Sequence, residues 1–194
     1  MFTGIIEEMG KIIEVRKTST YFTLTLEADQ IIKDLQVGDS VSVNGVCLTA
    51  ASLSPSSFTV DIMPETVNAT DLYQLSEGSF VNLERSMPAN GRFGGHFVSG
   101  HVDGTGEIVE RKPESNAVYY RIRTSAEITR YLVMKGSVAV DGASLTVFDV
   151  TEDTFTISLI PHTLEVTVLG RKETGDKVNI ECDVVGKYIE KLMK

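Results

Sequence analysis

A chain of 194 residues can form one large domain or two small ones, and its 42% hydrophobic and 23% charged residues are ordinary for a globular protein. The 27 acidic side chains outnumber the 18 basic ones and give a net charge of −9, which argues against binders of nucleic acid or anionic membranes, because both use basic surfaces. No apolar run approaches the roughly 20 residues of a membrane span, and the acidic start MFTGIIEEMG does not resemble a secretory signal. We therefore expect a cytoplasmic protein in which Cys47 and Cys182 form no disulfide.

The chain is a tandem repeat of two similar halves, which predicts a duplicated domain followed by a tail. Residues 43–49, 58–66 and 78–84 match residues 140–146, 155–163 and 175–181 at a constant offset of 97 residues, and residues 10–14 match residues 106–110 at an offset of 96. Because the matches keep their order, we expect one domain over residues 1–97, a second over residues 98–183, and a tail over residues 184–194.

Both halves are expected to be mainly β-strand. Alternating or β-branched runs predict strands at Thr23–Leu26, Val41–Val43, Phe58–Ile62 and Phe80–Glu84, and again at Tyr119–Arg123, Val138–Val140, Phe155–Leu159 and Val178–Glu181. Apolar residues spaced four apart predict one short helix in each half, near residues 28–35 and 126–135. Many short strands with Gly, Ser and Asp between them favour closed antiparallel barrels, since closure removes exposed sheet edges. The expected fold class is all-β, with two tandem barrels.

The tail has a helical pattern instead. Its apolar residues recur with a helical period, at Val184, Val185, Tyr188, Ile189, Leu192 and Met193. An isolated helix this short is marginal in water, so the apolar stripe needs a partner. That partner is either the chain's own barrel or the equivalent tails of an oligomer.

The two halves agree most closely around a turn and the residues that follow it. Asn44-Gly45 and Asp141-Gly142 are hairpin-turn dipeptides, followed by Cys47 in the first half and by Ser144 in the second. A thiol and a hydroxyl at equivalent positions could each contact a ligand, although a lone cysteine is more often a small core residue.

Three further features could carry chemistry or could be purely structural. The segments 63–66 and 160–163 end a strand with a proline, and their polar residues would lie at the barrel mouth. The glycine-rich junction over residues 91–106 holds His96 and His101, which could transfer protons, or it is a flexible linker. Asp183 ends the last strand, where a charged cap is the simpler interpretation. The three histidines lack metal-ligand spacing, so we expect no metal. No phosphate-binding fingerprint occurs, so a dinucleotide or P-loop site is not expected.

Twin pockets in one chain suit a reaction between two copies of one molecule, because holding both in register replaces an improbable encounter.

Six motifs resemble those of the riboflavin synthases of the α type. They are MFTGI at residues 1–5, NGVCLT at 44–49, GGHFVSGH at 94–101, DGASLTV at 141–147, IPHTLE at 160–165 and VNIECD at 178–183. The resemblance covers essentially the whole chain, including the repeat.

The resemblance implies a specific fold, assembly and reaction. Each half would be a six-stranded Greek-key barrel that binds lumazine, and the carboxy-terminal helices would join three subunits. Two molecules of 6,7-dimethyl-8-ribityllumazine would dismutate to riboflavin and 5-amino-6-(D-ribitylamino)uracil by transfer of a four-carbon unit, without cofactor or metal. The active site would form between the amino-terminal barrel of one subunit and the carboxy-terminal barrel of its neighbour. The tail ends at Lys194, earlier than in many members, which is expected to weaken the trimer.

The resemblance also implies site residues. The amino-terminal pocket would use Gly4, Ile5, Ile6, Ser40, Cys47, Leu48, Thr49, Asp61, Ile62, Met63, Pro64, Glu65, Thr66, Gly100, His101 and Val102. The carboxy-terminal pocket would use Lys135, Ser144, Leu145, Thr146, Ile160, Pro161, His162, Thr163, Leu164 and Glu165, with Asp183 nearby. His101 would assist proton transfer, and Ser144 and Thr146 would orient a lumazine. Asp183 would support the nucleophile or a proton step, and Cys47 and Ser40 would contact the other lumazine.

Two other functions compete with synthesis. A lumazine-carrying optical protein would share the duplicated barrel but would be expected to lose residues of the second pocket, whereas Ser144, Thr146, His162 and Asp183 are all present here. A flavin-dependent oxidoreductase would need a nicotinamide-binding half, and the sequence has no fingerprint for one.

Overall fold

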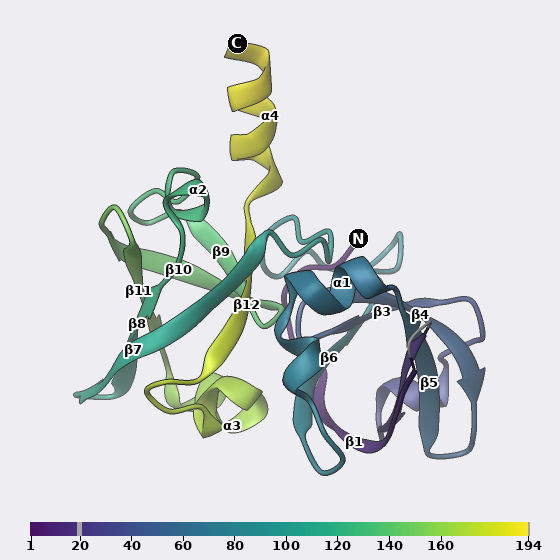
Figure 1. Ribbon diagram of the computed structural model, residues 1–194. Coiled ribbons are helices and arrows are strands. Elements are labelled where there is room, and N and C mark those ends of the chain that lie inside the picture. The colour runs from purple at the N-terminus through teal and green to yellow at the C-terminus, as the bar shows by residue number, and fades with distance from the viewer. Residues whose placement is uncertain (19–20, 194) are drawn as a thin grey trace.

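The chain folds into two barrels that lie side by side, with a carboxy-terminal helix that projects away from them (Figure 1). This computed structural model describes residues 1–18 and 21–193. The predicted all-β class and the tandem barrels are confirmed. Lys194, the last residue of the predicted tail, lies outside the described residues.

Each barrel is a closed antiparallel sheet of six strands. The first contains β1 (Glu8–Lys17), β2 (Phe22–Glu27), β3 (Ser40–Val43), β4 (Val46–Leu53), β5 (Ser57–Ile62) and β6 (Phe80–Arg85), in the order β1-β2-β5-β4-β3-β6. The second repeats that order with β7 (Gly104–Glu114), β8 (Ala117–Arg123), β9 (Ser137–Val140), β10 (Ala143–Val150), β11 (Thr154–Leu159) and β12 (Lys177–Cys182). In both, three hairpin-connected strands are followed by a fourth that returns beside the first, which is a Greek key.

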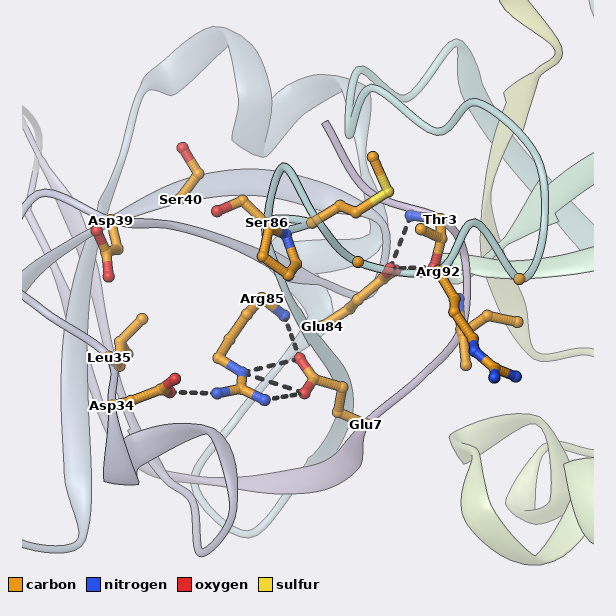
Figure 2. Close-up of a pocket in the computed structure, with 15 residues that line it drawn as sticks. Thr3, Glu7, Asp34, Leu35, Asp39, Ser40, Glu84, Arg85, Ser86 and Arg92 are labelled. Atoms are coloured by element: carbon orange, nitrogen blue, oxygen red, sulfur yellow. Dashed lines mark hydrogen bonds and ion pairs between the residues drawn. The ribbon is translucent and has the colours of Figure 1, made fainter.

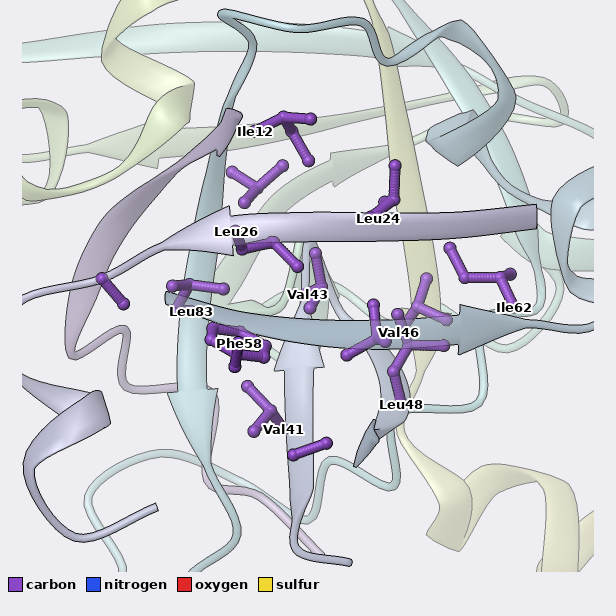
Figure 3. Close-up of a cluster of buried hydrophobic side chains, with 14 of the residues drawn as sticks. Ile12, Leu24, Leu26, Val41, Val43, Val46, Leu48, Phe58, Ile62 and Leu83 are labelled. Carbon is purple, nitrogen blue, oxygen red and sulfur yellow. The ribbon is translucent and has the colours of Figure 1, made fainter. Parts of the chain in front are cut away.

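The alternation of side chains along the strands decides which residues face the core and which face outward. On β4, Val46, Leu48 and Ala50 are buried in the first barrel's core, which Figure 3 shows filled by aliphatic side chains together with Phe58. The residues between them, Cys47 and Thr49, therefore point away from the core. Because the barrel interior is packed with side chains, any ligand pocket at Cys47 lies on the outer surface of the barrel.

The two barrels meet at their β3–β4 and β9–β10 hairpin turns. Asn44 and Gly45 have positive φ of 46° and 81°, and Asp141 and Gly142 have 45° and 80°, as a two-residue type I′ turn requires. A Cβ on Gly45 would lie 2.7 Å from the Gly142 nitrogen, so only glycine allows this approach. The Asn179 amide donates across the junction to the Asn44 carbonyl at 2.9 Å.

The helices differ from the sequence-based expectation. The two expected helices are shorter than predicted, being one 3-10 turn, η1 (Ile31–Lys33), and one short α-helix, α2 (Ala126–Thr129). Helices occur where the sequence predicted turns at the barrel mouth, namely α1 (Pro64–Ala69) and α3 (Pro161–Val166), each followed by a 3-10 turn, η2 (Asp71–Gln74) or η3 (Val168–Arg171). The prolines that end the strands also occupy the first helical turn, where a missing N–H costs nothing.

The tail forms the predicted helix, α4 (Val184–Met193). Its polar residues contact the second barrel: Glu190 pairs with Arg130 and Tyr131, and Lys187 Nζ lies 2.6 Å from Asp103 Oδ1. Its apolar residues are exposed instead, with Leu192 at 85% and Tyr188 at 68% of full exposure. None of the helices among the described residues is long and apolar enough to cross a membrane.

Candidate active site

The chain segments that precede the two barrels, residues 2–7 and 98–103, cross between them. We call them the first and second leading segments. They occupy equivalent places in the repeat and pair through an isolated antiparallel bridge, in which the Phe2 N–H donates to the Val98 carbonyl at 2.7 Å and the Val98 N–H donates to the Phe2 carbonyl at 3.2 Å. This bridge lies between the two barrels rather than within either sheet.

Each leading segment presses a glycine against the other barrel. The Gly4 carbonyl accepts the Ser144 N–H at 2.8 Å, and the Gly100 carbonyl accepts the Cys47 N–H at 2.8 Å. Both glycines have positive φ, 76° and 80°, and a Cβ would lie 2.6 Å from the Ser144 Cβ or 2.5 Å from the Cys47 Cβ. Close approach and backbone conformation both require glycine at these points.

This crossing changes the expected membership of the two pockets. In the first leading segment, expected in the amino-terminal pocket, Gly4 contacts Ser144 and Ile6 packs on the second core, whereas Ile5 lies beside Ser40 of the first barrel. The second leading segment lies against the amino-terminal barrel, because Val102 packs on the first core and His101 follows Gly100 directly. Sequence spacing could not show this exchange, since Gly4 and Ser144 are 140 residues apart and Cys47 and Gly100 are 53 residues apart.

The pocket at Ser144 contains a histidine that the predicted site omitted. His96 Nδ1 lies 2.7 Å from Ser144 Oγ, and His96 is buried. Burial lowers the pKa of His96, and the nearby Asp183 carboxylate opposes that shift. A neutral His96 can accept the Ser144 hydroxyl proton at Nδ1 and thereby fix the hydroxyl direction. The sequence signal that could have identified His96 was the GGH motif at residues 94–96. The structure explains its second glycine, because a Cβ on Gly95 would lie 2.0 Å from the Thr3 carbonyl oxygen.

Asp183 combines the structural role with proximity to the site. Its Oδ1 accepts the Val185 N–H at 3.0 Å, so the side chain satisfies a free N–H at the start of α4. The same carboxylate acts electrostatically on His96. Asp183 is therefore a charged helix cap, as the simpler interpretation has it, and it also lies near the Ser144 pocket.

The remaining candidates of the amino-terminal pocket surround Cys47. Thr49 lies opposite Ser40 in the β3–β4 register, and Cys47 is half-buried. Asp61 on β5 accepts the Thr23 hydroxyl at 2.8 Å. The other candidates lie at the end of β5 and in α1, where Ile62 is buried and Met63, Pro64, Glu65 and Thr66 are exposed or half-buried. Leu48 is a core residue and supports the pocket from below.

The carboxy-terminal pocket repeats this layout. Thr146 lies opposite Ser137, as Thr49 lies opposite Ser40, and Leu145 packs against the second core. Lys135 has a φ of 66° in the loop before β9, and its N–H donates to the Val147 carbonyl at 2.7 Å. Ile160 precedes α3, which carries Pro161, His162, Thr163, Leu164 and Glu165. The Thr167 hydroxyl bonds the Thr163 carbonyl at 2.7 Å, as the Thr70 hydroxyl bonds Thr66, so the two helices are held alike.

A separate cavity of about 530 Å³ lies beside the first leading segment (Figure 2). It includes Ser40 and Ile5 of the predicted residues but neither Cys47 nor His101. Arg85 on its wall is engaged by Glu7 and Asp34, as Figure 2 shows. The matched polar residues of the two halves therefore do not gather in this cavity. They lie on two faces, one on the outer wall of each barrel, where Cys47 packs on Phe2, Val98 and Ala139 and Ser144 contacts buried His96.

The comparisons with known proteins agree with this duplicated layout. The model of the lumazine binding domain matches residues 3–86 and again residues 99–183. The riboflavin synthase of Bacillus subtilis (strain 168) is 56% identical over 193 residues, which cover 100% of this chain and 90% of that protein. The chain belongs to the riboflavin synthase family. The riboflavin synthase of Schizosaccharomyces pombe is 43% identical over 196 residues, with 100% of this chain and 94% of that protein covered.

Solved structures give the same fold for this riboflavin synthase family member. LumP in complex with riboflavin superposes with a TM-score of 0.86 at 25% identity, covering 94% of this chain and 99% of LumP. LumP in complex with 6,7-dimethyl-8-(1'-D-ribityl) lumazine gives a TM-score of 0.85 at 23% identity over the same shares of both chains. Within residues 1–18 and 21–193, no three His, Cys, Asp or Glu side chains are arranged to hold a metal ion.

Proposed function

We propose that this chain is a transferase that performs the last step of riboflavin biosynthesis. It converts two molecules of 6,7-dimethyl-8-ribityllumazine into riboflavin and 5-amino-6-(D-ribitylamino)uracil, without cofactor or metal. The observation that carries the proposal is the pair of matched outward faces, one around Cys47 and one around Ser144, each completed by a glycine from the other half. Synthases similar over the full chain support the same assignment.

Two like pockets suit the chemistry because donor and acceptor are the same compound. One lumazine loses a proton from its acidic 7-methyl group and becomes a carbanion delocalised into the ring. The other is activated by nucleophilic addition at its C7. The four-carbon unit then passes from one ring system to the other, and the two products together contain every atom of the two substrates. Positioning supplies much of the acceleration, because the reacting atoms are held in register.

The side chains have distinct roles in this proposal. His101, exposed beside the Cys47 face, assists proton transfer, and Cys47 and Ser40 contact the lumazine there. Ser144 and Thr146 orient the second lumazine, and His96 keeps the Ser144 hydroxyl pointed through the 2.7 Å hydrogen bond. Asp183 supports the added nucleophile or a proton step at the Ser144 pocket.

The proposed assembly is a homotrimer in which two lumazines meet between the amino-terminal barrel of one subunit and the carboxy-terminal barrel of its neighbour. The lumazine-binding domains are residues 1–97 and 98–183, and residues 184–194 form the oligomerisation helix. The exposed apolar stripe of α4 supports this arrangement. The trimer would work in the cytoplasm.

The decisive experiment mixes purified protein with the lumazine alone and follows flavin absorbance. We expect flavin to appear, with one riboflavin formed for every two lumazines consumed. Ser144→Ala protein should bind lumazine but form flavin much more slowly while its circular dichroism spectrum is unchanged. A protein that binds one lumazine per chain and forms no flavin would be a carrier, and that result would overturn the proposal.

The intersubunit site has its own test by complementation. A variant damaged at the first pocket, Thr49→Arg, is mixed with one damaged at the second, Ser144→Arg, after mild dissociation and reassociation. If the site joins two subunits, a mixed trimer contains a site with two intact halves and regains activity. If both pockets of one chain form the site, every site keeps one defect and activity stays lost.

A further inference from the structure

We infer that Glu84 and Glu181 are crossed positioning residues: each carboxylate stands on one barrel and holds the leading segment that completes the pocket of the other barrel. The inference rests on the proposed function, which assigns one lumazine to each of the two pockets. Glu84 and Glu181 themselves belong to neither pocket. Both lie in the last strand of their own barrel, β6 or β12, at matched positions of the repeat.

Glu84 holds the first leading segment with both of its carboxylate oxygens. Its Oε1 accepts the Thr3 N–H at 2.7 Å and the Thr3 hydroxyl at 2.8 Å, and its Oε2 accepts the Gly4 N–H at 3.0 Å (Figure 2 shows Glu84 beside Thr3). The next contact along the chain is the Gly4 carbonyl, which accepts the Ser144 N–H. A residue of the first barrel therefore fixes the backbone that abuts Ser144 in the second barrel.

Glu181 makes the same three contacts in the opposite direction. Its Oε1 accepts the Ser99 N–H and the Ser99 hydroxyl, both at 2.6 Å, and its Oε2 accepts the Gly100 N–H at 2.9 Å. The Gly100 carbonyl then accepts the Cys47 N–H. The carboxylate of the second barrel thus fixes the segment that carries His101 past Cys47 in the first barrel.

Both carboxylates are almost fully buried, at 4% exposure for Glu84 and 2% for Glu181. Burial raises the pKa of Glu84, and its bonds to Thr3 and Gly4 oppose the rise. A buried carboxylate is costly, so its three donors must stay in place to offset the loss of water. The hydrogen bonds of both carboxylates go to the leading segments and not to Cys47 or Ser144, which makes each a positioning residue that acts through a glycine.

Glu→Gln variants test the crossing, because glutamine keeps one acceptor oxygen and presents an NH₂ group to the other backbone donor. Amide hydrogen exchange of the full-length protein, resolved by mass spectrometry, reports on the Cys47 and Ser144 amides separately. We expect Glu181→Gln to speed exchange at Cys47 by about tenfold or more and to leave Ser144 nearly unchanged, since a lost charged hydrogen bond is worth that factor. Glu84→Gln should do the reverse.

Ser99→Ala and Thr3→Ala are the milder pair, and they serve if a glutamine variant fails to fold. Each removes a hydroxyl donor while the backbone donors remain, so each should show the same crossed pattern at smaller size. Faster exchange at both amides in every variant, or faster exchange confined to the variant's own barrel, would overturn the inference.

Steady-state flavin formation separates this inference from the proposed function. If the carboxylates position the pockets, both glutamine variants should have a raised KM for lumazine. The unfolding midpoint of each variant should change too little to explain the raised KM. If the wild-type protein forms no flavin, the proposed function is wrong. The hydrogen-exchange experiment still tests the crossed contacts, because it does not depend on flavin formation. If flavin forms normally in both glutamine variants despite crossed exchange, the carboxylates hold structure only and the positioning role is overturned.

Discussion

His96 and Ser144 form the one side-chain pair in the described chain that couples a buried histidine to a pocket hydroxyl. Burial lowers the pKa of His96 and so favours the neutral imidazole, which can accept a hydrogen bond from the Ser144 hydroxyl. We predict that His96→Ala lowers kcat for flavin formation by about 10- to 100-fold, the size expected when a positioned polar partner is removed. Stopped-flow absorbance measures kcat, and unchanged circular dichroism excludes unfolding. An unaltered kcat would remove His96 from the site.

The pH dependence of stability follows from the same residue. The folded-state pKa of His96 lies below its unfolded value, so the unfolded chain takes up the proton first. Stability from the neutral buried ring is therefore present at neutral pH and is lost as pH falls below about 6.5. In His96→Ala protein this part of the loss should be absent, which urea titrations from pH 7 to 5 would measure.

A comparison of substitutions at Gly100 and Gly175 distinguishes the effect of backbone strain from the effect of close packing. Both have positive φ, but a Cβ on Gly100 would lie 2.5 Å from the Cys47 Cβ, whereas a Cβ on Gly175 meets nothing within 4 Å. We predict that Gly175→Ala costs about 1–2 kcal/mol of unfolding free energy and spares flavin formation, since only strain is added. Gly100→Ala should also reduce kcat/KM for lumazine, because it displaces Cys47. Equal kinetics in the two variants would contradict the packing argument.

At the scale of elements, the strands could be predicted from the sequence and several helices could not. Alternating residues located eight of the twelve strands within a few residues, since one face of each is buried in a barrel. Helices α1 and α3 were missed because a proline that ends a strand is also favoured at a helix start. The pocket membership of Gly4 and His96 depends on contacts between the halves, and no local pattern encodes those.

Helix α4 presents apolar residues to solvent while its polar side is tied to the second barrel through Lys187 and Glu190. We predict that Leu192→Glu lowers the oligomeric state, because it places a charge in the stripe that is expected to pack against equivalent tails. Lys191→Glu, outside the stripe, is the matched control and should leave the assembly intact. Sedimentation velocity at matched concentrations distinguishes the two. A Leu192→Glu protein that still sediments as the wild type would exclude α4 from the interface.

At the scale of the whole molecule, a buried charge cluster joins the two halves. Lys172 Nζ lies 2.9 Å from Asp141 Oδ2 and 3.3 Å from Asp71 Oδ2, and Asn82 donates to the Asp141 carbonyl at 2.8 Å. Asp141 stands where the first half has Asn44, and both side chains accept the N–H of the matched asparagine, Asn179 or Asn82. The positions that match Asp71 and Lys172 in the other half are Val168 and Leu75, so the two halves differ in charge at three positions of this junction.

Burial raises the pKa of Asp141 to about 6, above its ordinary value of 3.8. Between these values the folded chain keeps a proton that the unfolded chain releases, so stability falls as pH rises through that window. We predict that Asp141→Asn, which preserves the acceptor for Asn179, flattens this slope by on the order of 1 kcal/mol per pH unit. Denaturation at fixed protein concentration from pH 4 to 6.5 measures the slope. A slope identical to that of the wild type would place the titration elsewhere.

The exchange of leading segments also affects the order in which the two pockets can form during synthesis on the ribosome. Synthesis delivers the amino-terminal barrel first, and domains generally fold as units in that order. Its pocket, however, needs Gly100, and the residue that holds Gly100 is Glu181, which is synthesised 81 residues later. The half that emerges first is therefore the half that waits longest to be completed, and a nascent or truncated chain would display a formed barrel with an unfinished binding face.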